Sequence, residues 1–232
     1  IAQQDLFAED NDDDDDECSN IGVTVAGSMG AIGEVDRLAR YLNHGLGLLR
    51  SEFLFLNLHH EPSVDEMVTA FSSIPLTART FDFAGDKRPL FTLDMDEVGP
   101  LRKYGAQVGS RLLKNELRAL LLASQGREIC IVFPLITRIS EAKALNELLD
   151  QVKKELQHEG APMGEAKVAL MIETPAAVLS ARAFAAYGDM FLIGTSSLAE
   201  YAAAPRPPED YFTPALSKMI AIACKGAHDE GV

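Results

Sequence analysis

The sequence is short of basic residues and of long apolar runs, and each shortage excludes a class of protein. Lys and Arg number 21 against 35 Asp and Glu, which gives a formal net charge of −14. A nucleic-acid partner is excluded, because phosphate binding requires a clustered basic face. No apolar run approaches the roughly 20 residues that span a bilayer. Since a signal-peptide pattern is also missing, we expect no membrane partner.

Cysteine is scarce as well. The chain has three, Cys18, Cys130 and Cys224, with no short spacing that would pair them. This excludes a disulfide framework and predicts a reducing, cytoplasmic location. Cys130 lies inside the apolar run "ICIVF", and we interpret it as a core thiol.

Much of the negative charge lies in one run near the start of the chain. Residues 9–17 read "EDNDDDDDE", and adjacent aspartates repel one another and bury nothing. We therefore divide the chain into an acidic, disordered leader over residues 1–20 and one domain over residues 21–232. A metal-collecting tail is the alternative interpretation of the leader. Because the first residue is Ile1 rather than Met, we interpret the chain as a piece of a longer protein.

From residue 21 onward, short apolar runs alternate with segments of helical period. The predicted strands are 22–29, 46–56, 76–83, 128–136, 167–174 and 189–196. The predicted helices are 111–126, 140–160, 176–188 and 213–231, with Ser140 as an N-cap and Gly160 as a stop signal. Near-continuous apolar strands are typical of a parallel sheet buried on both faces. The alternation predicts an α/β domain, either a doubly wound open sheet or a (β/α)8 barrel.

Polar residues that follow the predicted strands favour the barrel. They lie at the carboxyl ends of four strands: Arg50 and Glu52, Arg79 and Asp82, Glu173, and residues 195–197. In a barrel these ends meet at one mouth, where the active site lies. Six strands are two short of closure, so we predict a barrel that is incomplete after about six β/α units. Two arginines at one mouth would form a cradle for phosphate or carboxylate, and an acid beside them could hold a bridging divalent cation.

Six segments, in order, carry a resemblance to a known family. They are "GLGLLRSEFLF", "RTFDFAGDK", "NELRALLLAS", "IVFPLI", "MIETPAA" and "LIGTSSLAEY". They resemble the signature stretches of the phosphoenolpyruvate-utilising barrels, most closely those of enzyme I of the phosphotransferase system. Pyruvate phosphate dikinase and phosphoenolpyruvate synthase are relatives of that family. The resemblance runs from about residue 22 to the end of the chain.

The resemblance implies a TIM-type (β/α)8 barrel of the phosphoenolpyruvate/pyruvate superfamily. Such a domain binds phosphoenolpyruvate or pyruvate with Mg²⁺. It passes the phosphoryl group to a histidine on a separate N-terminal domain, which serves a phosphocarrier protein in sugar transport. The family's barrels form homodimers. Its two substrate arginines fall on Arg50 and Arg79, and its metal-binding glutamate falls on Glu173. These residue types suit phosphoryl transfer, which needs charge neutralised and reactants held in line.

Two departures from the family pattern lie in "GTSSL". The family's "GTNDL" supplies an asparagine for the phosphate and an aspartate as second metal ligand, and these positions are Ser196 and Ser197 here. A hydroxyl is a poor replacement for a carboxylate on a hard cation. We therefore expect the Mg²⁺ site to be weak or lost.

Other family positions are harder to align. The family's further substrate arginines fall on Arg102 or Arg111, and on Arg206. The family's catalytic cysteine would follow Val232, and its phosphorylatable histidine belongs to the separate domain, so the resemblance assigns no catalytic residue to this chain. His44, His59 and His60 are interpreted as solvated side chains.

Two alternative functions stay open. One is a catalytically inactive relative that serves as a binding or regulatory module. The other is a Mg²⁺-dependent carbon–carbon lyase of the related pyruvate/oxaloacetate barrels. The loss of the "ND" pair counts against efficient catalysis, whereas the retained "LLRSEF", "RTFD" and "MIETP" stretches count against complete drift.

Overall fold

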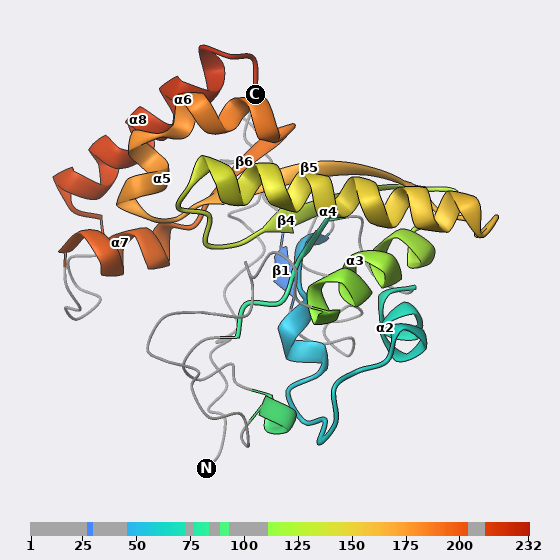
Figure 1. The fold of residues 1–232 in the computed structure, drawn as a ribbon. Helices are drawn as coiled ribbons and strands as arrows, with labels where there is room; N and C mark the ends of the chain where they lie inside the picture. Colours follow the sequence, from blue (N-terminus) through green and yellow to red (C-terminus); the bar gives the residue numbers. More distant parts are fainter. Residues whose placement is uncertain (1–26, 30–45, 73–76, 84–88, 93–110, 204–211) are drawn as a thin grey trace, which may run out of the picture.

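The computed structural model describes residues 27–29, 46–72, 77–83, 89–92, 111–203 and 212–232 (Figure 1). These residues form a sheet of six strands: β1 (Gly27–Met29), β2 (Leu46–Arg50), β3 (Thr77–Arg79), β4 (Glu128–Phe133), β5 (Glu165–Ile172) and β6 (Met190–Ile193). All six predicted strands are therefore confirmed, with shifted bounds. The acidic leader and the predicted strand residues 22–26 lie outside the described residues.

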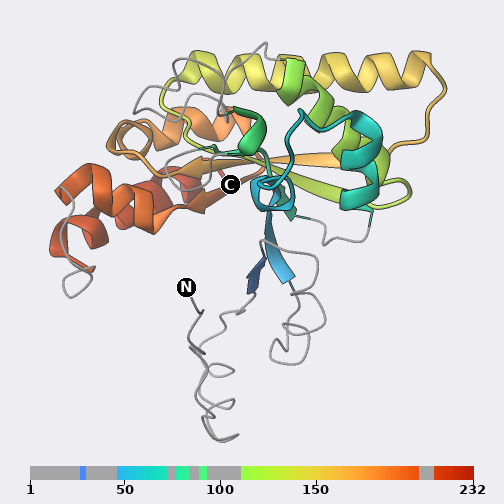
Figure 2. The same cartoon turned by 90° about the horizontal axis from the view of Figure 1, so that it is seen from below.

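The order of the strands identifies the architecture. Every neighbouring pair is parallel, and the order in the sheet is the order in the chain. A doubly wound sheet would reverse its order at a switch point, whereas a barrel wall adds each strand beside the last. The sheet also curls, since β1 and β2 lie at a steep angle to β4 and β5 (Figures 1 and 2). The predicted TIM-type barrel, incomplete in its strands, is confirmed.

Helices cover the outer face of this sheet. They are α2 (Val64–Phe71), α3 (Arg111–Ala123), α4 (Ile139–His158), α5 (Pro175–Leu179), α6 (Ala181–Phe184), α7 (Thr195–Ala203) and α8 (Pro214–His228). Alternate strand residues such as Ile131 and Leu170 are fully buried with the helices in the main core. Residues of the opposite parity, Val132, Ala169 and Met171, form a small separate cluster on the inner face. This inner face corresponds to the interior of a barrel, and its carboxyl edge corresponds to the barrel mouth.

The start of α4 differs from the prediction. Ser140 lies inside the helix and is not its N-cap, because the helix begins one residue earlier, with Arg138 as the cap residue. The Glu141 carboxylate accepts hydrogen bonds from the backbone N–H groups of Thr137 and of the cap residue Arg138, as the third residue of a capping box does. The predicted end is confirmed, since Gly160 adopts φ 68° just after the helix.

Two other predicted elements are shorter than expected. The predicted strand 46–56 ends at Arg50, where a 3-10 turn over Ser51–Leu54 begins. The predicted helix 176–188 is broken into α5, α6 and a 3-10 turn over Ala185–Tyr187, because Ser180 leaves the helical region of φ and ψ.

None of the described helices combines the length and the hydropathy that crossing a membrane requires.

Candidate functional site

Two arginines lie side by side where β2 and β3 end. The strand register pairs Arg50 directly with Arg79, and Arg79 with Val132 of β4. Val132 belongs to the inner-face cluster, so strand alternation places both arginines on that face as well. The structure thus brings the two predicted substrate arginines together at the carboxyl edge of the sheet.

Arg79 is held by two buried acids. Its guanidinium forms an ion pair with Glu52, in the turn after β2, and its Nη1 lies 3.5 Å from Asp82 Oδ2. Arg79 is 5% exposed, Glu52 0% and Asp82 1%. Buried ion pairs fix geometry more than they add stability. The sequence predicts polar residues at these strand ends, but the pairing of Arg79 across two strands with Glu52 becomes visible only in the structure.

Both arginines keep a donor without an acceptor. The Nε atoms of Arg50 and Arg79 are buried and make no hydrogen bond in the part of the chain that the structure describes. The Arg50 guanidinium lies over the Phe53 ring, 4.5 Å from its centroid. Buried polar groups nearly always have a partner. Two such N–H groups on neighbouring strands are therefore suited to an anionic ligand.

Glu173 lies between the ends of β4 and β6. It is 1% exposed, and its Oε1 accepts a hydrogen bond of 2.7 Å from the backbone N–H of Leu135, a residue in the left-handed region at φ 54°. A Cβ on Gly194 would lie 2.7 Å from Glu173 Cβ and 2.9 Å from its Oε2. Only glycine at position 194 leaves room for this carboxylate. The sequence placed Glu173 at the mouth but gave no sign of the roles of Leu135 and Gly194.

The two serines that follow β6 differ in exposure. We predicted both at the end of a strand, but β6 ends at Ile193 and both lie in the first turn of α7. Ser197 is buried, at 8% exposed, and Ser196 is exposed. The helix starts directly after Gly194, whose carbonyl accepts from Leu198 N–H. Of the two serines, only Ser197 is buried, and it lies three residues after the glycine that approaches Glu173.

The remaining predicted arginines do not complete the site in the described residues. Arg206 and Arg102 lie outside them. Arg111 is the first residue of α3, and its exposed side chain pairs with Glu61 at 3.1 Å. Since α3 packs on the outer layer with α2 and α4, Arg111 is not at the inner face. His59 and His60 are exposed, as predicted.

The donors available to a metal are few. In the described residues, no group of three or more His, Cys, Asp or Glu side chains could hold a metal ion. Glu173 nevertheless fits Mg²⁺ as a single ligand, because this ion is commonly bound by one or two carboxylates together with substrate oxygens. The described side chains alone do not provide enough ligands for a dedicated metal site.

One buried acid was missed from the sequence. Glu116 of α3 is fully buried, and burial raises its pKa to about 8. The signal was present, because Glu116 interrupts the apolar face formed by Leu113, Leu117 and Leu120 at helical spacing. Its carboxyl group contacts the Ser51 hydroxyl after β2 and the backbone N–H of Phe81 after β3.

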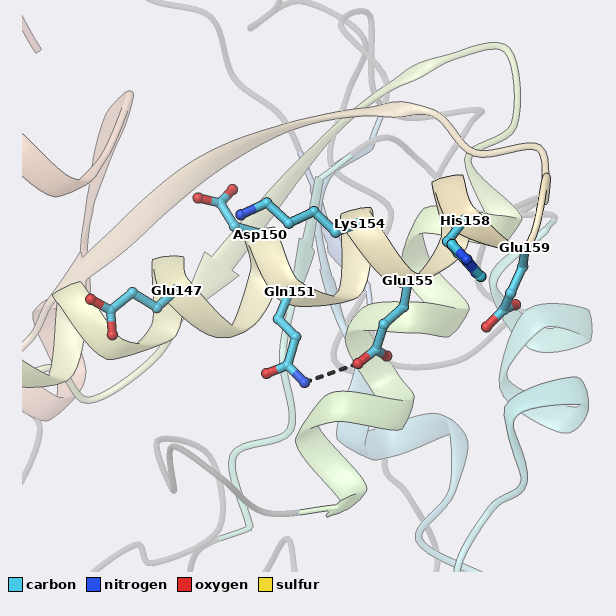
Figure 3. A pocket seen from close by; sticks show the side chains of 7 residues that line it. All are labelled: Glu147, Asp150, Gln151, Lys154, Glu155, His158 and Glu159. Atoms are coloured by element: carbon cyan, nitrogen blue, oxygen red, sulfur yellow. Dashed lines mark hydrogen bonds between the residues drawn. The ribbon is translucent and has the colours of Figure 1, made fainter.

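A groove along α4 lies apart from the candidate site. Figure 3 shows it lined by charged and polar side chains: Glu147, Asp150, Gln151, Lys154, Glu155, His158 and Glu159. Lys114 and Arg118 of α3 form ion pairs with Glu155 and Glu159 there. The groove lies on the second half of α4, which runs away from the carboxyl ends of the strands. We interpret it as a solvated face that joins two helices.

Comparison with known proteins agrees with this architecture. Residues 15–232 match the family model described as "PEP-utilising enzyme, PEP-binding domain". The phosphoenolpyruvate-protein phosphotransferase of Lactococcus lactis subsp. cremoris is 32% identical over 229 residues, covering 89% of this chain and 40% of that protein. The protein of the same name from Haloferax volcanii is 32% identical over 233 residues, covering 90% and 41%. The chain thus spans about 40% of the length of these relatives.

A solved citrate lyase from Burkholderia xenovorans LB400 has a similar fold. The TM-score is 0.59 at 14% sequence identity, with 88% of this chain and 60% of that chain covered. A likeness at this identity concerns the fold alone. The family assignment rests on the match over residues 15–232 together with the ordered motifs in the sequence. The chain therefore belongs to the family of PEP-utilising enzymes and corresponds to their PEP-binding domain.

Proposed function

We propose that this chain is the phosphoenolpyruvate-binding barrel of an enzyme I-like phosphoenolpyruvate-protein phosphotransferase with a degenerate metal site. The observation that carries the proposal is the pair of buried Nε–H donors on Arg50 and Arg79, which lack acceptors in the described residues. They lie on adjacent strands at the edge that also bears Glu173. A small phosphate- or carboxylate-bearing ligand would satisfy both donors.

The arginines would bind and orient the substrate. Arg50 and Arg79 would neutralise the anion, and Glu52 and Asp82 would hold the Arg79 guanidinium in one orientation while it does so. Positioning and charge neutralisation are most of what phosphoryl transfer asks of a protein. Phosphoenolpyruvate and pyruvate both carry the carboxylate that such a cradle recognises, so both are proposed ligands.

Glu173 would hold Mg²⁺ together with oxygens of the ligand. The ion, when bound, would neutralise charge on the phosphate and the enolate oxygens. The Leu135 N–H and the space above Gly194 keep the Glu173 carboxylate in place for this role. Ser197 offers a hydroxyl where the family pattern has an acid, and Ser196 offers another for the phosphate. Arg206 is a further proposed substrate contact outside the described residues. With one carboxylate, we expect weak Mg²⁺ binding.

The remaining roles concern the longer protein. We propose that the phosphoryl group passes to a histidine on an N-terminal domain and then to a phosphocarrier protein for sugar transport. We further propose that the protein is a cytoplasmic homodimer. The names of the relatives and the partial coverage of their length support the transfer role, and the scarcity of cysteine supports the location.

A second candidate function is a catalytically inactive binding module. The observation that favours it is the combination of one carboxylate at the cation position with an Arg79 side chain already engaged by two acids. Such a chain would bind the anion without help from Mg²⁺. The lyase alternative is supported only by the similar fold of a citrate lyase.

Calorimetric titration with oxalate, a stand-in for the enolate of pyruvate, tests the proposal. Oxalate should bind the parent chain, more tightly with Mg²⁺ than without it. Arg50→Gln should weaken binding by roughly tenfold to a hundredfold, because it removes a charged hydrogen-bond donor worth about 1.5–3 kcal/mol. Arg182→Gln, which removes an equal charge from an exposed pair with Glu230, is the matched control and should leave affinity unchanged.

The outcomes separate the candidates. Binding that needs Arg50 and gains from Mg²⁺ supports the transfer enzyme. Binding that needs Arg50 but ignores Mg²⁺ supports the inactive module. Equal loss in the Arg50 and Arg182 variants would show that only net charge matters, and the proposed cradle would then be wrong.

A further inference from the structure

Glu116 is out of place among the buried acids of the described residues. Glu52 and Asp82 face the Arg79 guanidinium, and Glu173 accepts from a backbone N–H at the mouth. Glu116 instead reaches from α3 to the Ser51 hydroxyl after β2 and the Phe81 N–H after β3, and it is 0% exposed. A charged carboxylate buried without a cation of its own costs several kcal/mol, so its protonation state needs an explanation.

The hydrogen bonds around Glu116 explain its protonation state. Ser51 Oγ lies 2.7 Å from the Arg79 carbonyl oxygen and also 2.7 Å from Glu116 Oε1. A hydroxyl carries a single proton, and a carbonyl oxygen can only accept. If Ser51 donates to Arg79, then the short contact with Glu116 requires a proton on the carboxyl group. If Ser51 donates to Glu116 instead, two buried oxygens face each other at 2.7 Å with no proton between them.

The charges nearby lead to the same answer. Among the described residues, Arg50 and Arg79 contribute two positive charges to this group, and Glu52 and Asp82 contribute two negative ones. An ionised Glu116 would add a third negative charge to these five described side chains, four of which are buried. We propose that Glu116 is a protonated, uncharged carboxylic acid that positions the β2 and β3 ends, and with them Arg79, for anion binding.

The geometry explains how a neutral Glu116 would position the ends of β2 and β3. Its hydroxyl donates to Ser51, whose own hydroxyl donates to the Arg79 carbonyl. The Phe81 N–H donates to the two carboxyl oxygens, at 3.1 Å and 3.0 Å. The acid therefore links α3 to the backbone on both sides of Thr80. The Arg79 side chain is held by Glu52 and Asp82, and its backbone is held through Glu116.

The pKa of Glu116 supports the neutral form. It is raised from 4.5 to about 8, with burial as the largest cause. The hydrogen bonds with Phe81 and Ser51 and the charge of Arg79 act to lower it, and the charge of Glu52 acts to raise it. Acids on the other helices packed against α3 have partners at the surface. Glu66 of α2 pairs with His60. Glu155 of α4 and its C-cap residue Glu159 pair with Lys114 and Arg118 of α3.

A pH dependence follows with a definite sign. The folded chain holds this proton up to about pH 8, whereas the unfolded chain releases it near pH 4.5. The folded state therefore binds more protons between these values, and its stability from this group falls as the pH rises. The folding equilibrium constant should fall tenfold for each pH unit in that window relative to a variant without the titrating group.

Glu116→Gln is the matched variant, because a neutral amide keeps the acceptor for Phe81 and a donor for Ser51. The infrared difference between the ligand-free parent and this variant at pH 6 should contain the carbonyl band of a protonated carboxylic acid. In urea unfolding from pH 5 to pH 9, the free energy of unfolding of the variant should rise relative to that of the parent as the pH increases. Glu116→Ala should lose stability at every pH, since it leaves Ser51 and Phe81 without their partner.

Oxalate affinity measures whether Glu116 positions Arg79 for anion binding. This measurement alone rests on the proposed function. Glu116→Gln should bind oxalate within about twofold of the parent at pH 6 and more tightly than the parent at pH 9. A missing carbonyl band, or parallel pH profiles for the parent and the Gln variant, would overturn the neutral acid. If the Gln variant does not fold, the band in the parent, titrated from pH 6 to pH 9, decides alone. Failure of the parent to bind oxalate would refute the proposed function and leave the infrared result valid.

Discussion

The two halves of the sheet's carboxyl edge are built differently. At the ends of β2 and β3, Arg79 and three acids are buried together beside the half-buried Arg50, and side chains hold one another. At the ends of β5 and β6, Glu173 is the one acid among the described residues of that edge, and backbone groups hold it. The first half is dense in charge and rigidly paired. The second half is sparse and depends on a glycine and a left-handed leucine.

The difference separates the two tasks of the proposed site. In the proposed site, an anion would be recognised by the half that has two arginines together with the acids that orient Arg79. A cation would be recognised by the half with a single carboxylate and a serine, and hard cations need negative oxygen ligands. We infer that anion binding and metal binding can be lost independently in this barrel. A substitution in one half should therefore leave the binding function of the other half unchanged.

The largest expected effect is on stability in the charge-dense half. Glu52→Ala removes one side of a buried ion pair and leaves the Arg79 guanidinium short of an acceptor. Breaking a buried pair in this way costs about 3–5 kcal/mol. Urea unfolding at constant pH should show that loss in the free energy of unfolding, with little change in Mg²⁺ binding per folded molecule.

Glu159→Ala is the control for this experiment, because its carboxylate forms an exposed pair with Arg118 on the outer layer. Screening by solvent makes such a pair weak, so this variant should unfold close to the parent. Equal losses in the two variants would mean that the Glu52–Arg79 pair is no more important to the fold than a surface pair.

The next effect falls on the sparse half. Gly194→Ala would place a methyl group 2.7 Å from Glu173 Cβ and 2.9 Å from its Oε2. The carboxylate has to move, and overpacking of this kind costs about 1–3 kcal/mol. Calorimetry should show weaker Mg²⁺ binding in the presence of oxalate, while oxalate alone binds as in the parent.

Gly160→Ala separates this contact from ordinary glycine strain. Gly160 has φ 68° and no atom within 4 Å of an added Cβ, so alanine there costs stability through its backbone only. Mg²⁺ binding should be unaffected in that variant. If both glycine variants lose Mg²⁺ affinity to the same extent, the close approach of Glu173 to Gly194 has no role in the metal site.

The fold could be predicted from the sequence because its signals are local. Continuous apolar runs marked all six strands, and glycines marked the ends of α3 and α4. The predicted bounds are wrong where a side chain contacts a distant element of the chain. The strand from 46 ends at Arg50 since Ser51 and Glu52 turn to contact the β3 segment, which lies 27 or more residues away. Periodicity carries no information about such distant contacts.

Motifs nominated the candidate residues Arg50, Arg79 and Glu173 but not the contacts around them. The register brings the two arginines together, and the roles of all three residues stay predictions. Glu116 could have been found as an acid on the apolar face of α3. The role of Leu135 could not, because a positive φ at a leucine depends on the hydrogen bond to Glu173. Sequence patterns identify which residues meet at a mouth but not which of them hold one another.

The smallest expected effect is a gain in the sparse half. Ser197→Asp adds a carboxylate at the buried position in the first turn of α7, close to the glycine that contacts Glu173. A second negative ligand should strengthen Mg²⁺ binding by roughly tenfold, about 1.4 kcal/mol. Titration of Mg²⁺ with oxalate present measures this gain.

Ser196→Asp is the matched control, since it adds the same charge to the same helical turn at an exposed position. Both variants gain equally from the helix dipole and from net charge, so any difference between them reports direct contact with the ion. A gain in Ser197→Asp alone would mean that the sparse half lacks only its second acid and that its geometry is intact. Equal changes in both would mean that the cation position has drifted in shape as well as in charge, and the barrel would then retain its anion half alone.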